Sequence, residues 1–146
     1  YPAATFLATP CYVEGSLGGS NSGRDVMIIV ETADLTPGAG NPSPDEYPVA
    51  VHSQIGSTFG VAYSRASNSL FASAHMKRHT SFGPGGPGAI YKIDLMGNTP
   101  APPFTGNVVS TFLDLNGLLG NGVAGADPRP APNNFNRDPT AYDAVG

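Results

Sequence analysis

The sequence predicts an all-β fold of antiparallel sheets with long Gly/Pro loops, arranged as propeller-like blades or, as the alternative, a β-sandwich. Three observations favour this class. Gly and Pro, which both interrupt helices, supply 19 and 15 of the 146 residues. No stretch of helical length combines freedom from Gly and Pro with a helical apolar period. Short β-branched or alternating apolar runs, which are typical of strands, recur between the loops.

The chain is expected to form one domain with three parts, because its length suits a single core. Residues 1–24 predict an extended N-terminal arm, with a short strand around Cys11–Val13, and a flexible Gly/Ser loop. Residues 25–115 predict the β core, including one clear four-stranded unit at 59–115. Residues 116–146 are rich in Asn, Asp and Pro and predict a loop-like tail.

Within the core, the apolar run 25–33 predicts a buried strand by its length and residue types. Residues 34–48 contain four prolines and predict a loop, and 49–55 predict a further short strand. The remaining strands are expected at 59–64, 69–77, 89–95 and 108–115. Alternation places the following side chains together on one face of their strand: Leu70, Ala72, Ala74 and Met76, and then Ala89, Tyr91, Ile93 and Leu95.

The charge balance and the single cysteine exclude several classes of function. A net charge of −4 with 7 Lys and Arg residues argues against nucleic-acid binding. No apolar run approaches the roughly 18 residues of a membrane-spanning helix. Cys11 has no second cysteine in the chain, so we expect a buried thiol or a bond to another molecule. Polar loops with few charges indicate an extracellular or cell-surface location.

The stretch "AHMKRHTSFGPGGPGAIYKID" (74–94) contains the most suggestive chemistry. Its histidines, four apart, would align as metal ligands on a helix, but here they fall on a strand and a loop. A third zinc ligand would have to come from His52, Asp94 or Cys11. The favoured interpretation is a basic corner that clamps the Gly-Pro loop or contacts a ligand, formed by His75, Lys77, Arg78 and His79. The glycines of "GPGGPG" do not have the spacing of a nucleotide-binding loop.

Asn and Asp residues on loops near the C-terminus favour Asx turns and helix caps, with a calcium site bound by their side-chain oxygens as the alternative. The residues are Asp114, Asn116, Asp127 and Asp138. No other cofactor is expected. We also predict no catalytic residues, because paired carboxylates are lacking and "GSTFG" (56–60) only approximates the G-x-S-x-G elbow of serine hydrolases.

Segment 55–95, with its "AYS…LFASA" hairpin, "KRH" and "GAIYKID", resembles the N-terminal β-propeller-like region of large secreted bacterial surface proteins. In those proteins this region often precedes serine–aspartate-repeat-adhesin B-type or other immunoglobulin-like repeats. The stretches "CYVEG", "FLDLNG" and "ADPRP" are also similar to that family. The resemblance implies a surface location. This chain has only two to three blades' worth of residues, which would leave strand edges open.

From these features we expect a non-enzymatic extracellular structural or adhesive module. It would self-associate, or bind neighbouring domains of a longer chain, through open strand edges and the extended arm, including as a filament. Surface glycans are a further expected partner. The alternative is a ligand-binding or catalytic propeller fragment with its site on the loop His75–His79.

Overall fold

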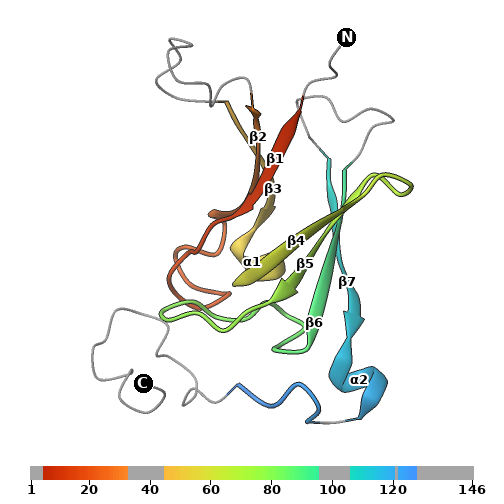
Figure 1. The fold of residues 1–146 in the computed structure, drawn as a ribbon. Coiled ribbons are helices and arrows are strands. Elements are labelled where there is room, and N and C mark those ends of the chain that lie inside the picture. Colours follow the sequence, from red (N-terminus) through yellow and green to blue (C-terminus); the bar gives the residue numbers. More distant parts are fainter. Residues whose placement is uncertain (1–4, 33–44, 96–105, 121, 128–146) are drawn as a thin grey trace.

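The computed structural model describes residues 5–32, 45–95, 106–120 and 122–127, which form two antiparallel sheets and two short helices (Figure 1). Most of the expected tail 116–146, including Asp138, lies outside the described residues. Within the described part, no helix has the length and apolar character that crossing a membrane requires.

The first sheet has three strands in the order β1-β2-β3. Its strands are β1 (Phe6–Pro10), β2 (Asp25–Glu31) and β3 (Glu46–Val51). β2 lies in the centre because "DVMIIVE" is apolar enough to be buried on both faces, and its residues Val26 to Val30 are all buried. A one-turn helix, α1 (His52–Ile55), follows β3 directly and leads into the second sheet.

The second sheet is a four-stranded meander in the order β4-β5-β6-β7. Its strands are β4 (Thr58–Ser64), β5 (Ser69–Ala74), β6 (Ala89–Asp94) and β7 (Val108–Asp114). The short helix α2 (Leu115–Leu119) begins where β7 ends, and the side chain of Asp114 accepts a hydrogen bond from the backbone of Asn116. The register of the meander shifts twice, because Gly60 is an extra residue in β4 and Phe112 is an extra residue in β7.

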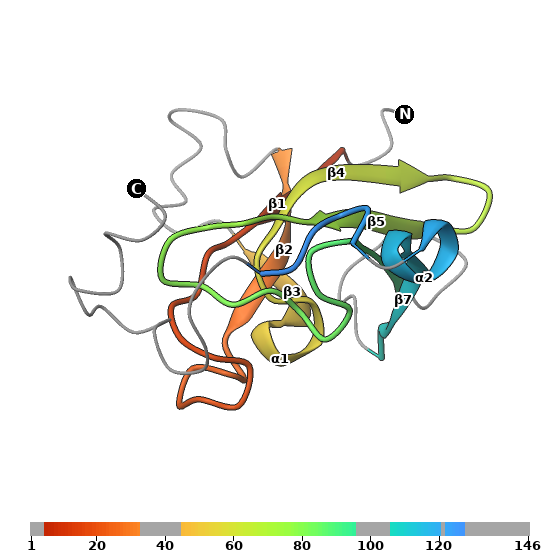
Figure 2. The same cartoon turned by 90° about the horizontal axis from the view of Figure 1, so that it is seen from below.

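The two sheets share one hydrophobic core. Alternating residues of β5 and β6 face inward, and they meet β2 and β3 there. The buried side chains include Met27, Ile29, Val49, Leu70, Ala72, Tyr91 and Ile93. At one side of this arrangement β1 contacts β4, so the edges of the two sheets meet (Figures 1 and 2).

The prediction of an all-β fold is confirmed, and two packed antiparallel sheets agree with the sandwich alternative. A propeller is not shown, because the described residues form two sheets and a propeller requires roughly four to eight blades.

Three local predictions differ from the structure. The strand expected around Cys11–Val13 is wrong, because the strand lies earlier, at Phe6–Pro10, and pairs with β2 of the same chain. The strand expected at 49–55 begins at Glu46 instead and gives way to α1. β5 ends at Ala74, three residues before the predicted end, since the chain there turns toward Ser57.

Candidate functional site

The basic corner lies just beyond β5, where three rings from different segments gather. The ring of His75 lies 5.3 Å from that of Phe59 and 6.3 Å from that of Tyr12, measured between centroids. The Nζ atom of Lys77 lies 4.7 Å from the centre of the Tyr12 ring, within cation–π range. His75 is therefore part of an aromatic cluster with Tyr12 and Phe59.

The backbone of this corner ties two distant loops together. The N–H of Thr80 donates to the carbonyl of Lys77, closing a turn in which His79 has a φ of 68°. The N–H of Gly15 then donates to the carbonyl of His79 at 2.8 Å, and the N–H of Ser81 donates to the carbonyl of Gly15. The corner thus anchors the loop before β2.

The Gly-Pro loop is held from inside by a core residue that the sequence did not single out. The hydroxyl of Tyr91, which is 1% exposed, accepts a hydrogen bond from the backbone N–H of Gly85 at 3.0 Å. Burial raises the pKa of Tyr91, and the nearby Asp114 raises it further, while the Gly85 bond acts in the opposite direction. Tyr91 was visible in the sequence only as one apolar position in an alternating strand.

The predicted metal ligands do not converge in the described part of the chain, where no group of three or more His, Cys, Asp or Glu side chains could hold a metal ion. Asp94 instead bonds the hydroxyl of Ser69 and pairs with Lys92, whose Nζ lies 2.6 Å from its carboxylate. These two contacts lower its pKa.

The predicted calcium ligands have local roles where they are described. Asp114 caps α2 through Asn116, and the side-chain oxygen of Asn116 accepts a hydrogen bond from the N–H of Ala124 at 2.9 Å. Asp127 lines a shallow cavity elsewhere. Asp138 lies outside the described residues, so the complete calcium set stays a prediction.

A serine and a histidine that resemble a nucleophile and its base lie in the core. Nε2 of His52 is 3.3 Å from the hydroxyl oxygen of Ser81, and the His52 side chain is fully buried. Among the described residues Nδ1 of His52 has no hydrogen-bond partner, so the third, orienting group of a catalytic triad is lacking. Burial lowers the pKa of His52, which keeps the ring neutral at physiological pH.

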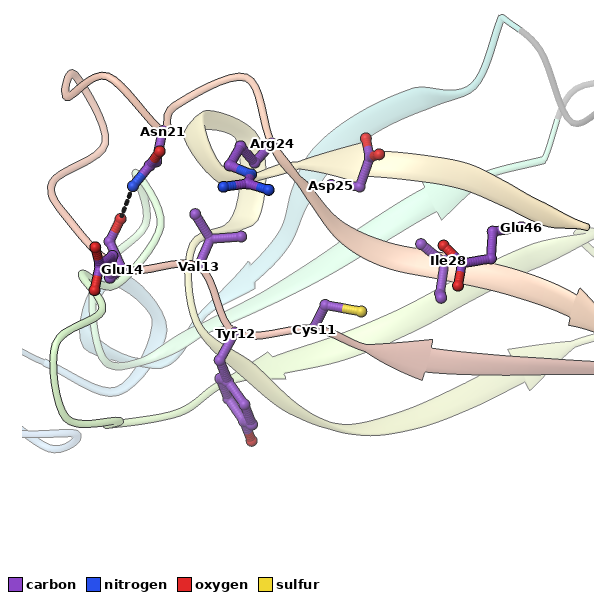
Figure 3. A pocket seen from close by; sticks show the side chains of 9 residues that line it. All are labelled: Cys11, Tyr12, Val13, Glu14, Asn21, Arg24, Asp25, Ile28 and Glu46. Carbon is purple, nitrogen blue, oxygen red and sulfur yellow. Dashed lines mark hydrogen bonds between the residues drawn. The ribbon is translucent and has the colours of Figure 1, made fainter. Parts of the chain in front are cut away.

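A polar cavity of about 580 Å³ lies between the segment after β1 and the first sheet (Figure 3). Three carboxylates and the guanidinium of Arg24 line it, together with the thiol of Cys11. All lining residues are Cys11, Tyr12, Val13, Glu14, Asn21, Arg24, Asp25, Ile28 and Glu46. The side chain of Asn21 donates to the carbonyl of Glu14 at 3.1 Å and closes one end.

The cavity does not activate its thiol. Cys11 is a free, half-buried cysteine. Burial raises its pKa, and the negative charges of Glu46 and Asp25 raise it further. Because the thiolate is the nucleophilic form, Cys11 stays a protonated, weakly reactive thiol at neutral pH.

No family model matches the chain, and no solved structure matches it. Three proteins of Dictyostelium discoideum are similar to it. The chain is 36% identical to Colossin-A over 90 residues, 32% identical to Colossin-D over 92 residues, and 26% identical to Colossin-C over 120 residues.

These matches overturn the resemblance stated from the sequence. The relatives found are Dictyostelium colossins, and no family model supports an origin among bacterial adhesin-repeat proteins. The matched segments cover 60%, 63% and 82% of this chain, but 1%, 10% and 11% of Colossin-A, Colossin-D and Colossin-C respectively. The chain is therefore similar to short parts of much longer Dictyostelium colossins.

Proposed function

We propose that the chain is a non-enzymatic structural or adhesive module that joins to copies of itself, or to neighbouring domains, through the edge of β7. The observation that carries this proposal is that β7 contains no proline and no charge before its last residue, and that Val108–Thr111 pair regularly with β6. An exposed strand edge with unpaired N–H and C=O groups is a template for pairing with another chain.

The other three edge strands of the described sheets carry protective features. β3 contains Pro48, which has no N–H to donate, carries the charge of Glu46, and runs straight into α1. β1 ends at Pro10 and contacts β4. β4 contacts β1 along this side and is interrupted by an extra residue, Gly60, whose φ is 74°.

β7 has fewer of these devices, because its one irregularity, the extra residue Phe112, leaves Val108–Thr111 in regular pairing with β6. Its sequence "VVSTFLD" contains no proline, and its single charge is the terminal Asp114. Val108 and Phe112 are 52% and 58% exposed. α1 also contacts β7, but the N–H groups of His52 and Ser53 donate to Arg24 and Ser22, so they do not pair with the β7 edge.

The comparisons support a role as one unit among several. The similar segments are small fractions of long colossins, so a module of this kind has neighbouring domains within its own chain. The polar, weakly charged loops favour a location outside the cell, which we include in the proposal. Because Phe6–Pro10 already pairs with β2, the proposed route is edge pairing at β7, and it does not require donation of the N-terminal arm.

The propeller interpretation stays part of the proposal in a narrower form. The up-and-down order β4-β5-β6-β7 is that of a four-stranded propeller blade. We propose that this sheet serves as such a blade only if neighbouring domains supply further blades. The blade interpretation is tested by the same experiments on the β7 edge.

The association is tested by light scattering after size exclusion, over a range of protein concentrations. The wild-type chain is expected to increase in mass with concentration. Ser110→Glu, which places a charge on the edge opposite Lys92 of its own sheet, is expected to stay monomeric and folded. Leu7→Glu on β1 is the matched control and should associate like the wild type. A wild-type monomer at all concentrations would contradict the proposal.

A second candidate is ligand binding at the aromatic cluster of Tyr12, Phe59 and His75, because 40% of Tyr12 and 61% of Phe59 are exposed beside Lys77. Exposed rings of this kind suit the apolar faces of sugars, and surface glycans are the proposed ligand. Chemical-shift titration with oligosaccharides, comparing wild type with Phe59→Ala, tests this candidate. Unchanged shifts at the cluster would rule it out.

A further inference from the structure

We propose that two copies of the chain pair β7 with β7 in antiparallel orientation about a two-fold axis, forming a closed dimer with a continuous eight-stranded sheet. This inference rests on the proposed association through β7. It replaces the filament expected from the sequence with an assembly that ends at two copies.

Closure follows from the number of usable edges. A head-to-tail filament needs two different complementary surfaces on each copy, one to receive and one to donate. In the described sheets, β1 and β4 contact each other at one side of the core, and Pro48 interrupts β3, whereas Val108–Thr111 of β7 form a regular edge before the extra residue Phe112. β7 is then both the donor and the receiver, and a surface that pairs with itself generates two-fold symmetry.

The two ends of β7 complement each other when the strands are antiparallel. At its start, Val108 is 52% exposed, and just past its end Leu118 and Leu119 of α2 are 64% and 61% exposed. Antiparallel pairing brings the start of one β7 beside the end of the other, so these apolar side chains meet across the seam. A parallel arrangement would instead place like ends together.

The charges also favour this orientation. Residues Val108 to Leu113 are uncharged, so no like charges oppose each other along most of the seam. Asp114 lies at one end of β7. With the axis near the middle of the strand, each Asp114 faces the uncharged start of the partner strand, and the two carboxylates are separated by the length of β7.

Symmetry restricts the register. A two-fold axis perpendicular to the sheet keeps the outer face of each copy outward, including the face where Phe112 packs against Phe71 at 5.0 Å in an edge-on arrangement. Residues directly opposite each other in a sheet point to the same face, and faces alternate along the regular stretch Val108–Thr111 that precedes the extra residue Phe112. One residue of β7 must therefore lie opposite its own copy.

Disulfide scanning identifies that residue. The only cysteine in the chain is removed by Cys11→Ser, and in that background single cysteines are placed in turn at the regularly paired positions Val108, Val109, Ser110 and Thr111. Paired residues in antiparallel strands have Cα atoms about 4.5–5.5 Å apart, within the range of a disulfide. Residues one step away are offset along the strand and point to the other face. Under copper–phenanthroline oxidation, we expect a covalent dimer in high yield at one position.

Gly18→Cys in the same background is the control, because Gly18 lies in an open loop with nothing near its Cβ position. It should cross-link no faster than by random collision. Native mass spectrometry should show a dimer and no higher species. Edge-dependent assemblies larger than a dimer, blocked by Ser110→Glu but without self-cross-linking at any position, would refute the two-fold pairing and leave edge association standing. A monomer in every assay would refute both.

Discussion

Gly56 lies where two backbone segments cross, and replacing it with alanine is expected to destabilise the fold severely. Its φ of 59° and ψ of −143° belong to a region that is populated almost entirely by glycine. A Cβ atom at this position would lie 2.2 Å from the backbone nitrogen of Gly83 and 2.4 Å from the carbonyl carbon of Phe82. Both obstacles are backbone atoms, so no side-chain rotation can relieve the contact.

Two costs add in Gly56→Ala. Holding alanine in this backbone conformation costs about 1–3 kcal/mol. Pushing the two backbone segments apart is an overpacking cost of about 1–3 kcal/mol. The expected loss in the free energy of unfolding is therefore about 2–6 kcal/mol, compared with a total of roughly 5–15 kcal/mol for a domain.

The loss is measured by urea unfolding followed by far-UV circular dichroism. Gly18→Ala is the matched control, because open space surrounds that glycine and its φ is not positive. It should leave stability unchanged or raise it by about 0.4–1 kcal/mol through the unfolded chain. If Gly56→Ala unfolds at the same urea concentration as Gly18→Ala, the backbone of Phe82 and Gly83 does not lie against Gly56.

Two further predictions concern buried polar groups. Tyr91→Phe removes the acceptor for the N–H of Gly85 and is expected to lower the free energy of unfolding by about 1–3 kcal/mol. Tyr63→Phe should cost less, because the Tyr63 hydroxyl bonds Asn68 at the exposed surface. Equal losses in urea unfolding would contradict this difference. Burial lowers the pKa of His52, so below about pH 6.5 the unfolded chain binds a proton more readily than the folded protein does. The stability of the fold is therefore complete above about pH 6.5. It declines as the pH falls from there toward the lowered pKa, by at most about 1.4 kcal/mol per pH unit. His52→Asn should remove this part of the slope, and an unchanged slope would show that His52 is not the titrating group.

The strands of the second sheet were predictable because their alternation matches the way they are buried. Leu70 and Ala72 on β5, and Ala89, Tyr91 and Ile93 on β6, face the shared core as the sequence pattern implied. The N-terminal strand was misplaced because Phe6–Pro10 includes no strict alternation and is stabilised by pairing with β2. α1 was missed because four residues are too few for a helical period.

The candidate sites were less predictable than the fold. The sequence drew attention to His75 and His79 by their spacing, but spacing has structural meaning only on a regular element, and the chain turns between them. Tyr91, which holds the Gly-Pro loop, had no polar signal in an apolar pattern. The cavity around Cys11 joins residues from separate segments, which one sequence cannot bring together.

The sequence by itself determined the all-β class, since frequent Gly and Pro prevent long helices and short alternating runs form sheets. It also excluded a helical membrane span and an internal disulfide. Only the tertiary structure decided how the sheets pack and which strands form their edges. The edges depend on which strands become neighbours, and pairing between residues distant in sequence, such as Phe6 with Glu31, leaves no local signal. The resemblance to a propeller and the short chain predicted open edges, and the strand order of the two sheets places β1, β3, β4 and β7 at them.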